Sequence, residues 1–212
     1  MLKKVFINSR KIPIPVPVRT LDEALRWVEE TLVPAGHTVT RVVLDGRILA
    51  GDEFASRLNE GLGETSQLEV QIDSPVDLMV QALDATRNLA SVVLDGIKML
   101  AVECWQTRAL KPGGLDAVAT DVELILDLID HSAGLVDQLL IEATSIEGIA
   151  HMLKKAALGV SMAKSNSDWK ACARLLLNRI EPLLKDLIVE TETLQIRVLT
   201  HTGTALAQGG RG

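Results

Sequence analysis

Heptad repeats of apolar residues fill most of the chain after residue 75, and they limit its possible folds more than any other feature. Apolar residues recur in alternating steps of three and four, so each repeat forms a seam along one side of a helix. Three seams are present: Val76, Val80, Leu83, Arg87, Ala90, Leu94, Ile97, Ala101 and Cys104; Val118, Val122, Ile125, Ile129, Ser132, Val136, Leu139 and Ala143; and Ala173, Leu177, Ile180, Leu184, Leu187, Thr191, Leu194 and Val198. Such seams are buried against other helices, so the sequence predicts a helical bundle.

The start and end of this bundle are marked by local signals. Ser74 suits an N-cap and Pro75 suits the first helical position, so we expect the helices to begin at residue 74. Breaks near residues 110 and 144 and at the polar stretch 164–167 predict three or four helices, the last ending near Gly203. Pro182 lies inside this last helix and is expected to kink or split it. We therefore expect a bundle over residues 74–203 and a disordered tail over residues 204–212.

The first 73 residues have a different pattern, with short runs of alternating apolar and polar residues that are typical of strands. Prolines 13, 15 and 17 recur at every second position of one run, which predicts a strand at the edge of a sheet. Thr20 followed by Glu23 forms a capping-box pattern at the start of a helix. The expected order is strands at 4–7 and 12–18, a helix from 20, strands at 38–44 and 47–49, a short helix at 52–58 and a strand at 67–72.

This order resembles the β-grasp fold of ubiquitin-like domains. The closest local resemblance is Arg41-Val42-Val43-Leu44-Asp45-Gly46-Arg47-Ile48-Leu49, which looks like the ubiquitin segment where two short strands meet at a Gly turn. The resemblance implies an α+β protein, with a β-grasp domain at 1–73 followed by the bundle. Ubiquitin ends in a free Gly-Gly tail, whereas here the last strand runs into Ser74-Pro75, and Gly209-Gly210 lie beyond the bundle. Conjugation is therefore not expected.

A second, shorter resemblance covers residues 167–184. Asp168-Trp169 opens a helix that later carries Glu181-Pro182, and this segment is similar to the closing helix of a group of uncharacterised bacterial helical proteins. The resemblance implies a bacterial origin and no known activity.

Composition excludes several classes of protein. The net charge of -6 and the 2% aromatic content argue against nucleic-acid binding, which needs basic surfaces and stacking platforms. No apolar run approaches the roughly 18 residues of a membrane span, and polar residues interrupt the start of the chain where a signal peptide would be apolar. We expect a cytoplasmic protein. Cys104 and Cys172 both fall on apolar stripes and are expected to be buried free thiols.

Two pairs of residues have a spacing that would suit a metal ion. Asp127 and His131 are four residues apart, as are Glu147 and His151, so each pair shares one side of a helix. Carboxylate-bridged metal bundles use more carboxylates and a Glu-x-x-His spacing. We therefore interpret these residues as surface pairs and expect no metal, cofactor or catalytic residue.

Charge is segregated between the helices. Residues 115–143 contain seven acidic residues and neither Lys nor Arg, whereas Lys and Arg recur from Lys154 to Arg179. We expect these charges to pair between neighbouring helices; the alternative is an acidic face that selects a basic partner. Trp105 and Trp169 are expected to fill the core. They are also the candidate interaction residues, because each lies near a helix end where an amphipathic ring can anchor an interface.

These observations lead to a non-catalytic protein-interaction, scaffold or adaptor protein of unknown bacterial pathway. Two alternatives stay open, a metal- or small-ligand-binding bundle and an enzyme with an unrecognised site. Helices of about 30 residues would be about 45 Å long, which exceeds what a single small bundle readily covers. We therefore expect a homodimer held together by the helical seams.

Overall fold

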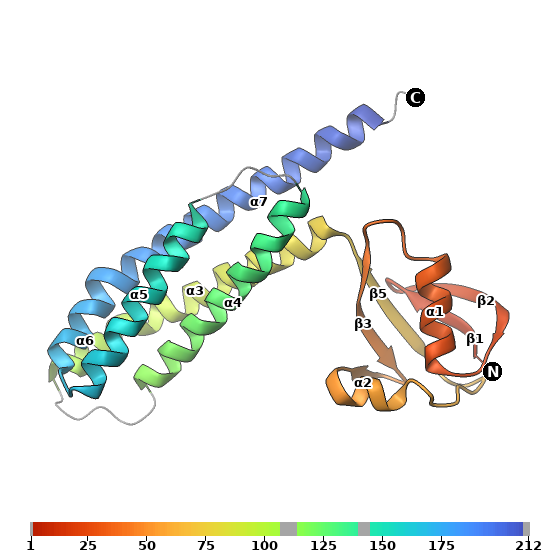
Figure 1. Ribbon diagram of the computed structural model, residues 1–212, viewed down its shortest axis with the longest axis horizontal. Helices are drawn as coiled ribbons and strands as arrows, with labels where there is room; N and C mark the ends of the chain where they lie inside the picture. Colours follow the sequence, from red (N-terminus) through yellow and green to blue (C-terminus); the bar gives the residue numbers. More distant parts are fainter. Residues whose placement is uncertain (1, 107–113, 140–144, 210–212) are drawn as a thin grey trace. The chain divides into compact units, whose positions relative to one another are not determined.

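The chain divides at Pro75 into an α+β unit, residues 1–75, and a helical unit, residues 76–212 (Figure 1). The computed structural model describes residues 2–106, 114–139 and 145–209. The predicted α+β class is confirmed, and the division lies close to the boundary expected after residue 73.

The first unit contains a five-stranded sheet with the strand order β2-β1-β5-β3-β4. Strands β1 and β5 pair in parallel, and the other neighbours pair antiparallel. The elements are β1 (Leu2–Ile7), β2 (Arg10–Val18), α1 (Leu21–Thr31), β3 (Thr38–Leu44), β4 (Arg47–Leu49), α2 (Gly51–Arg57) and β5 (Leu68–Asp73). This order agrees with the one predicted from the alternating runs.

Helix α1 packs on one face of this sheet because its apolar residues share one side. Leu21, Ala24 and Val28 are fully buried and join the inward residues of the strands in one core. Thr20 is the N-cap: its hydroxyl accepts a hydrogen bond from the Glu23 backbone N–H, and the Glu23 carboxylate accepts one from the Arg19 backbone N–H. The predicted cap at Thr20 is therefore confirmed.

Both hairpins turn through residues with positive φ. Asn8 and Ser9 have φ of 46° and 67°, and Asp45 and Gly46 have φ of 51° and 79°. Two consecutive residues with positive φ define the tight turn that matches the twist of antiparallel strands, and Asn, Asp and Gly adopt it most readily. The Asn8 side chain also donates to the Ile72 carbonyl at 2.9 Å and accepts from its N–H at 2.8 Å, which ties this turn to β5.

Strand β2 lies at an edge of the sheet, as its prolines predicted. Ile12 is paired with Val5 and Pro13 with Lys4, and the register shifts beyond Pro13. Because proline has no N–H, this edge offers fewer donors to an added strand.

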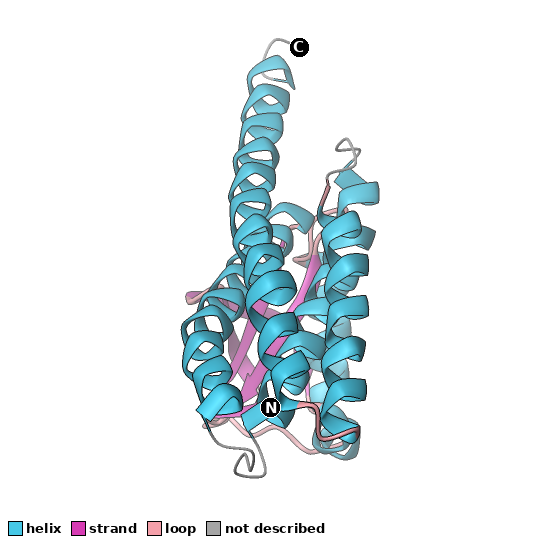
Figure 2. Ribbon diagram, turned by 90° about the vertical axis from the view of Figure 1, so that its left-hand side faces the viewer, coloured by secondary structure: helices cyan, strands magenta, loops and turns pink. Residues whose placement is uncertain are grey.

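The second unit consists of helices that run side by side, seen from two directions in Figures 1 and 2. They are α3 (Pro75–Gln106), α4 (Gly114–Leu139), α5 (Ile146–Ser165), α6 (Trp169–Leu175), the π-helix η1 (Leu176–Ile180) and α7 (Glu181–Gly209). The helix that carries the C-terminus, α7, reaches past the ends of the others in both views.

The predicted seams form the core of this unit. The side chains of Ile97, Ile125, Leu184 and Leu187 are fully buried. They belong to one apolar cluster, to which α3, α4, α5, α6, η1 and α7 all contribute residues. The seams are therefore buried within a single chain, whereas the dimer prediction placed them between two chains. The homodimer stays a prediction, but the seams no longer support it.

Pro182 is accommodated by a change of helix type. The π-helix η1 ends two residues before it, and α6, η1 and α7 follow one another without a non-helical residue between them. Proline in a regular helix would clash with the carbonyl four residues earlier, that of Asn178, and leave it without an N–H partner. The wider π turn relieves this conflict, so the predicted split takes the form of a π segment.

The last helix is longer than predicted. We expected it to end near Gly203, but α7 continues to Gly209. Ala205, Leu206, Ala207 and Gln208 are good helix formers, which favours continuation past a single glycine. Residues 210–212, the rest of the tail expected to be disordered, lie outside the described residues. In the described ranges, no helix is both long and apolar enough to cross a membrane.

Candidate functional site

One outward side of α4 carries a line of carboxylates, the acidic stripe, made of Asp116, Glu123, Asp127 and Asp130. Spacings of seven, four and three residues place these exposed side chains on the same side of the helix. Lys164 of α5 pairs with Asp116, whereas the other three form no ion pair with another described residue. The pairing expected between neighbouring helices is therefore found at one member of the stripe.

Two hollows lie between α4 and the neighbouring α5. The larger, of about 360 Å³, is rimmed by Asp127, Asp130, Glu147, His151 and Lys154 above a floor of Leu126, Ile129, Ala133 and Ala150. The smaller, of about 200 Å³, lies beside the Asp116–Lys164 pair at the other end of the two helices. The small side chains of Ala133 and Ala150 leave the larger hollow open.

The metal-ligand candidates are only partly brought together. Asp127, Glu147 and His151 line the larger hollow, but His131 is exposed on α4 and is not among its lining residues. Over the described ranges, no group of three or more His, Cys, Asp or Glu side chains is arranged to hold a metal ion. Metal coordination requires donor atoms within about 2–2.6 Å of one point.

The outward side of α5 has the opposite character to that of α4. Lys154 and Lys155 are exposed and form no ion pair with a described residue, and Leu158 and Met162 beside them are 61% and 60% exposed. Charge segregation was visible in the sequence, but this combination with apolar side chains was not recognised. The signal was available, because Leu158 and Met162 are apolar residues away from the buried positions of α5.

Large apolar side chains also lie on the outward parts of α3 and α7, off the seams, and together they are named the α3–α7 apolar face. Arg87 bonds to Gln195, and Lys98 lies 3.9 Å from Glu181, so α3 and α7 are antiparallel neighbours. A hydrogen bond from Lys185 lowers the pKa of Glu181, which keeps this carboxylate ionised beside Lys98. The members of the face are Val92, Met99, Val102, Trp105, Val189, Ile196 and Leu199, all about half exposed or more.

The two candidate tryptophans differ in exposure. Trp105 is 49% exposed near the described end of α3 and belongs to the α3–α7 apolar face. Trp169 is half-buried at the start of α6 and packs against the core of the helical unit. Trp105 therefore has a free surface for a partner, while Trp169 mainly fills space.

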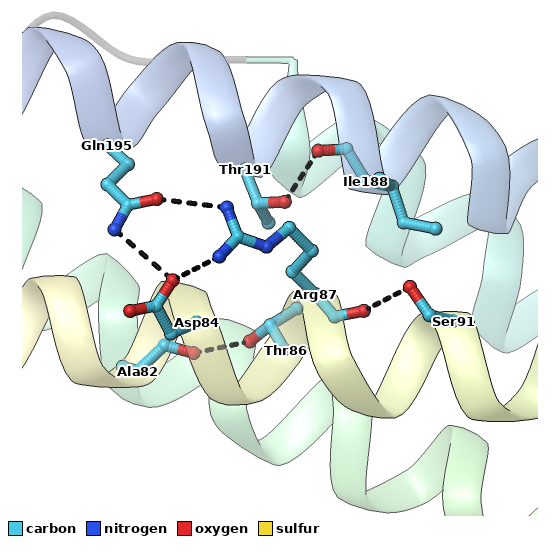
Figure 3. Close-up of polar contacts among 8 residues, drawn as sticks. All are labelled: Ala82, Asp84, Thr86, Arg87, Ser91, Ile188, Thr191 and Gln195. Atoms are coloured by element: carbon cyan, nitrogen blue, oxygen red, sulfur yellow. Dashed lines mark hydrogen bonds and ion pairs between the residues drawn. The ribbon is translucent and has the colours of Figure 1, made fainter.

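The seam between α3 and α7 contains a polar network (Figure 3). The Arg87 guanidinium donates to Asp84 at 2.5 Å and to the Gln195 side-chain oxygen at 3.2 Å, and the Gln195 amide donates to Asp84 at 3.2 Å. Thr86 and Thr191 are buried, and their hydroxyls donate to the carbonyls of Ala82 and Ile188. These bonds satisfy polar groups inside an otherwise apolar seam, so the network is structural.

The two cysteines are buried free thiols, as predicted. Burial is the main cause that raises the pKa of Cys104 from 9.0 to about 11, and it also raises the pKa of Cys172. A nucleophilic cysteine requires a lowered pKa and access to substrate. These thiols have neither property.

The first unit has a shallow hollow on the sheet, of about 590 Å³. Phe6 and Val43 line it together with polar residues of β3, β5 and the turn between β1 and β2, including Arg41, Glu69 and Gln71. The polar groups carry both charge signs, and Gln71 is already bonded to the neighbouring Asp73. This surface suits polar contacts without indicating a particular ligand.

Comparison with known proteins relates only the first unit to a family. Residues 4–74, about a third of the chain, match the family model described as TP0873 N-terminal domain, an uncharacterised family. No curated protein matches the chain. No solved structure matches it either. The matched segment corresponds closely to the first unit, so the similarity concerns the α+β unit and brings no activity with it.

Proposed function

We propose that this chain is a non-catalytic interaction protein, a scaffold or adaptor in which a β-grasp domain precedes a helical bundle that contacts a protein partner. The observation that carries the proposal is the α3–α7 apolar face. Met99 and Ile196 are 71% and 66% exposed on a unit whose seams are already filled. Large apolar side chains gathered on one surface are typical of protein interaction sites.

The register of α3 and α7 places apolar side chains of the two helices at the same height along the helices. Arg87 lies level with Gln195, and Lys98 lies level with Glu181, so antiparallel counting places Val92 level with Val189. Helical spacing turns Val92, Met99, Val189 and Ile196 away from the buried positions of their helices. We infer that a partner lying along the two helices contacts apolar side chains of both.

The β-grasp assignment is supported by topology. The order β2-β1-β5-β3-β4 has a hairpin on each side of the parallel pair β1 and β5. Helix α1 connects the first hairpin to the second and packs on the sheet. This is the arrangement that the resemblance to ubiquitin-like domains implies.

The alternatives have weaker support. A metal- or ligand-binding bundle would use the larger hollow between α4 and α5, where Asp127, Glu147 and His151 do not form a metal-holding group. An enzyme that uses a cysteine nucleophile would need a thiol with a lowered pKa, whereas burial raises the pKa values of Cys104 and Cys172.

Quantitative capture of partners from a bacterial lysate tests the proposal. The paired substitution Met99→Glu with Ile196→Glu places charge on the α3–α7 apolar face and is expected to abolish specific capture. The control Gln81→Glu with Asn88→Glu adds the same charge at exposed polar positions of α3 and is expected to retain it. Equal capture by both variants, with unchanged circular dichroism, would refute the proposed face.

A further inference from the structure

The α4–α5 surface combines opposite charges on adjacent, antiparallel helices. Glu123 and Asp127 of the acidic stripe are exposed on α4, while Lys154 and Lys155 are exposed on α5. None of the four forms an ion pair with another described residue, although the sequence had suggested pairing within the chain. The surface is therefore self-complementary: each helix carries the charge that the other one would attract.

The opposite charges also lie at similar heights along the two helices. Asp116 is level with Lys164, and Asp127 and Asp130 rim the same hollow as His151 and Lys154. Counting between these two fixed points places Glu123 and Asp127 level with the α5 segment that carries Lys154 and Lys155. Rotation about a two-fold axis parallel to the helices leaves the height of each residue unchanged. It also brings α4 of one copy opposite α5 of the other.

We propose that two copies of the chain associate through this surface, with α4 of each copy lying against α5 of the other. Glu123 and Asp127 of one copy then face Lys154 and Lys155 of the second, and symmetry repeats the contact. Leu158 and Met162, 61% and 60% exposed in the single chain, become covered together with Leu124 of α4, which is 48% exposed.

The available area fits a reversible dimer. Two helices with a shared length of about 30 Å and a combined width of about 20 Å offer roughly 600 Å² per copy. The total of about 1,200 Å² lies at the lower end of specific interfaces. Because facing charges supply much of the complementarity, the dimer is expected to weaken as ionic strength rises.

This inference goes beyond the proposed function and uses a different surface. The partner site was placed on α3 and α7, whereas self-association uses α4 and α5. Substitutions on one face leave the other unchanged, so the failure of one proposal is distinguishable from the failure of the other.

A charge-swap experiment tests the dimer by sedimentation of the full chain. Wild-type protein at low ionic strength should give about twice its chain mass of 22.9 kDa. The variant Glu123→Lys with Asp127→Lys places lysines at the contact positions of both helices, and Lys154→Glu with Lys155→Glu places carboxylates at the contact positions of both. Each variant alone should be monomeric, with a dissociation constant raised more than about 100-fold because like charges then face each other.

Mixing the two variants should restore the dimer, because each basic surface then meets an acidic one. The chain that combines all four substitutions should dimerise with itself for the same reason. A control, Asp186→Lys with Glu192→Lys on exposed positions of α7, changes the net charge as much as the first variant and should stay dimeric. Circular dichroism checks that each chain is folded.

A wild type that stays monomeric at high micromolar concentration and low ionic strength would overturn the proposal. So would a folded charge-reversed variant that still dimerises, or a mixture that stays monomeric. The last two outcomes would mean that association, if present, uses another surface.

Discussion

Arg87 occupies a seam position of α3 that an apolar residue would fill in a regular heptad. Its side chain is 31% exposed, so the aliphatic stem covers the seam while the guanidinium reaches Asp84 and Gln195 (Figure 3). Thr86 and Thr191, at the same seam, use nearby backbone carbonyls instead. Each polar residue is thus tolerated because a partner for its polar atoms is close by.

Removal of this side chain should weaken the bundle. Arg87→Ala loses the two side-chain bonds and the packing of the stem, and we expect the free energy of unfolding to fall by about 1–2 kcal/mol, measured by urea denaturation. The exposed neighbour Gln81, changed to Ala, should alter it by less than about 0.5 kcal/mol. A cycle with Gln195→Ala should show coupling, and strictly additive effects would argue against an interhelical network.

Local signals at the scale of single elements act before any long-range contact forms. Thr20 begins α1 with a hydroxyl bond to the Glu23 N–H at 3.2 Å, and Glu23 returns a bond to the Arg19 N–H at 2.7 Å. These bonds satisfy donors that the first turn of a helix otherwise leaves unpaired. They also fix the point where the chain leaves β2 and enters α1.

Loss of the cap should destabilise the first unit specifically. Thr20→Ala is expected to cost about 1 kcal/mol. For a domain of this size that corresponds to a fall of about 4–8 °C in its melting temperature, measured by circular dichroism. Thr31→Ala, at the exposed end of the same helix, removes a hydroxyl for which no hydrogen bond is found among the described contacts, and serves as the control. An equal effect of both substitutions would contradict a capping role for Thr20.

The elements differ in how far the sequence predicts them. Seams and turns are local: heptads predicted the buried Ile125, Leu184 and Leu187, and Asp45-Gly46 predicted its turn. The π-helix Leu176–Ile180 was missed because it depends on how Pro182 is fitted into a helix held by its neighbours. The outward residues were missed for another reason. The periodicity of apolar residues identifies the buried seam. It does not predict whether residues at the remaining positions, such as Met99 or Lys154, contact other residues.

At the scale of the whole molecule, two separate cores divide the chain. Leu21, Leu44 and Leu68 belong to one, and Ile97, Leu153 and Leu187 belong to the other. The match to the family described as TP0873 N-terminal domain ends at residue 74, beside the division at Pro75. Each unit buries its own apolar residues in its own core, as a domain that folds independently does.

Two measurements should therefore separate the units. Residues 1–75 expressed alone are expected to unfold cooperatively, as shown by circular dichroism and dispersed amide signals in NMR spectra. In the full chain, Leu187→Asp buries an unpaired charge at a position that is 0% exposed, which should cost several kcal/mol and unfold the bundle. The transition of the first unit should persist in that variant, and Asp186→Lys at the exposed neighbouring position should preserve both transitions. A random-coil fragment, or loss of both transitions in Leu187→Asp, would show that the two cores do not fold independently.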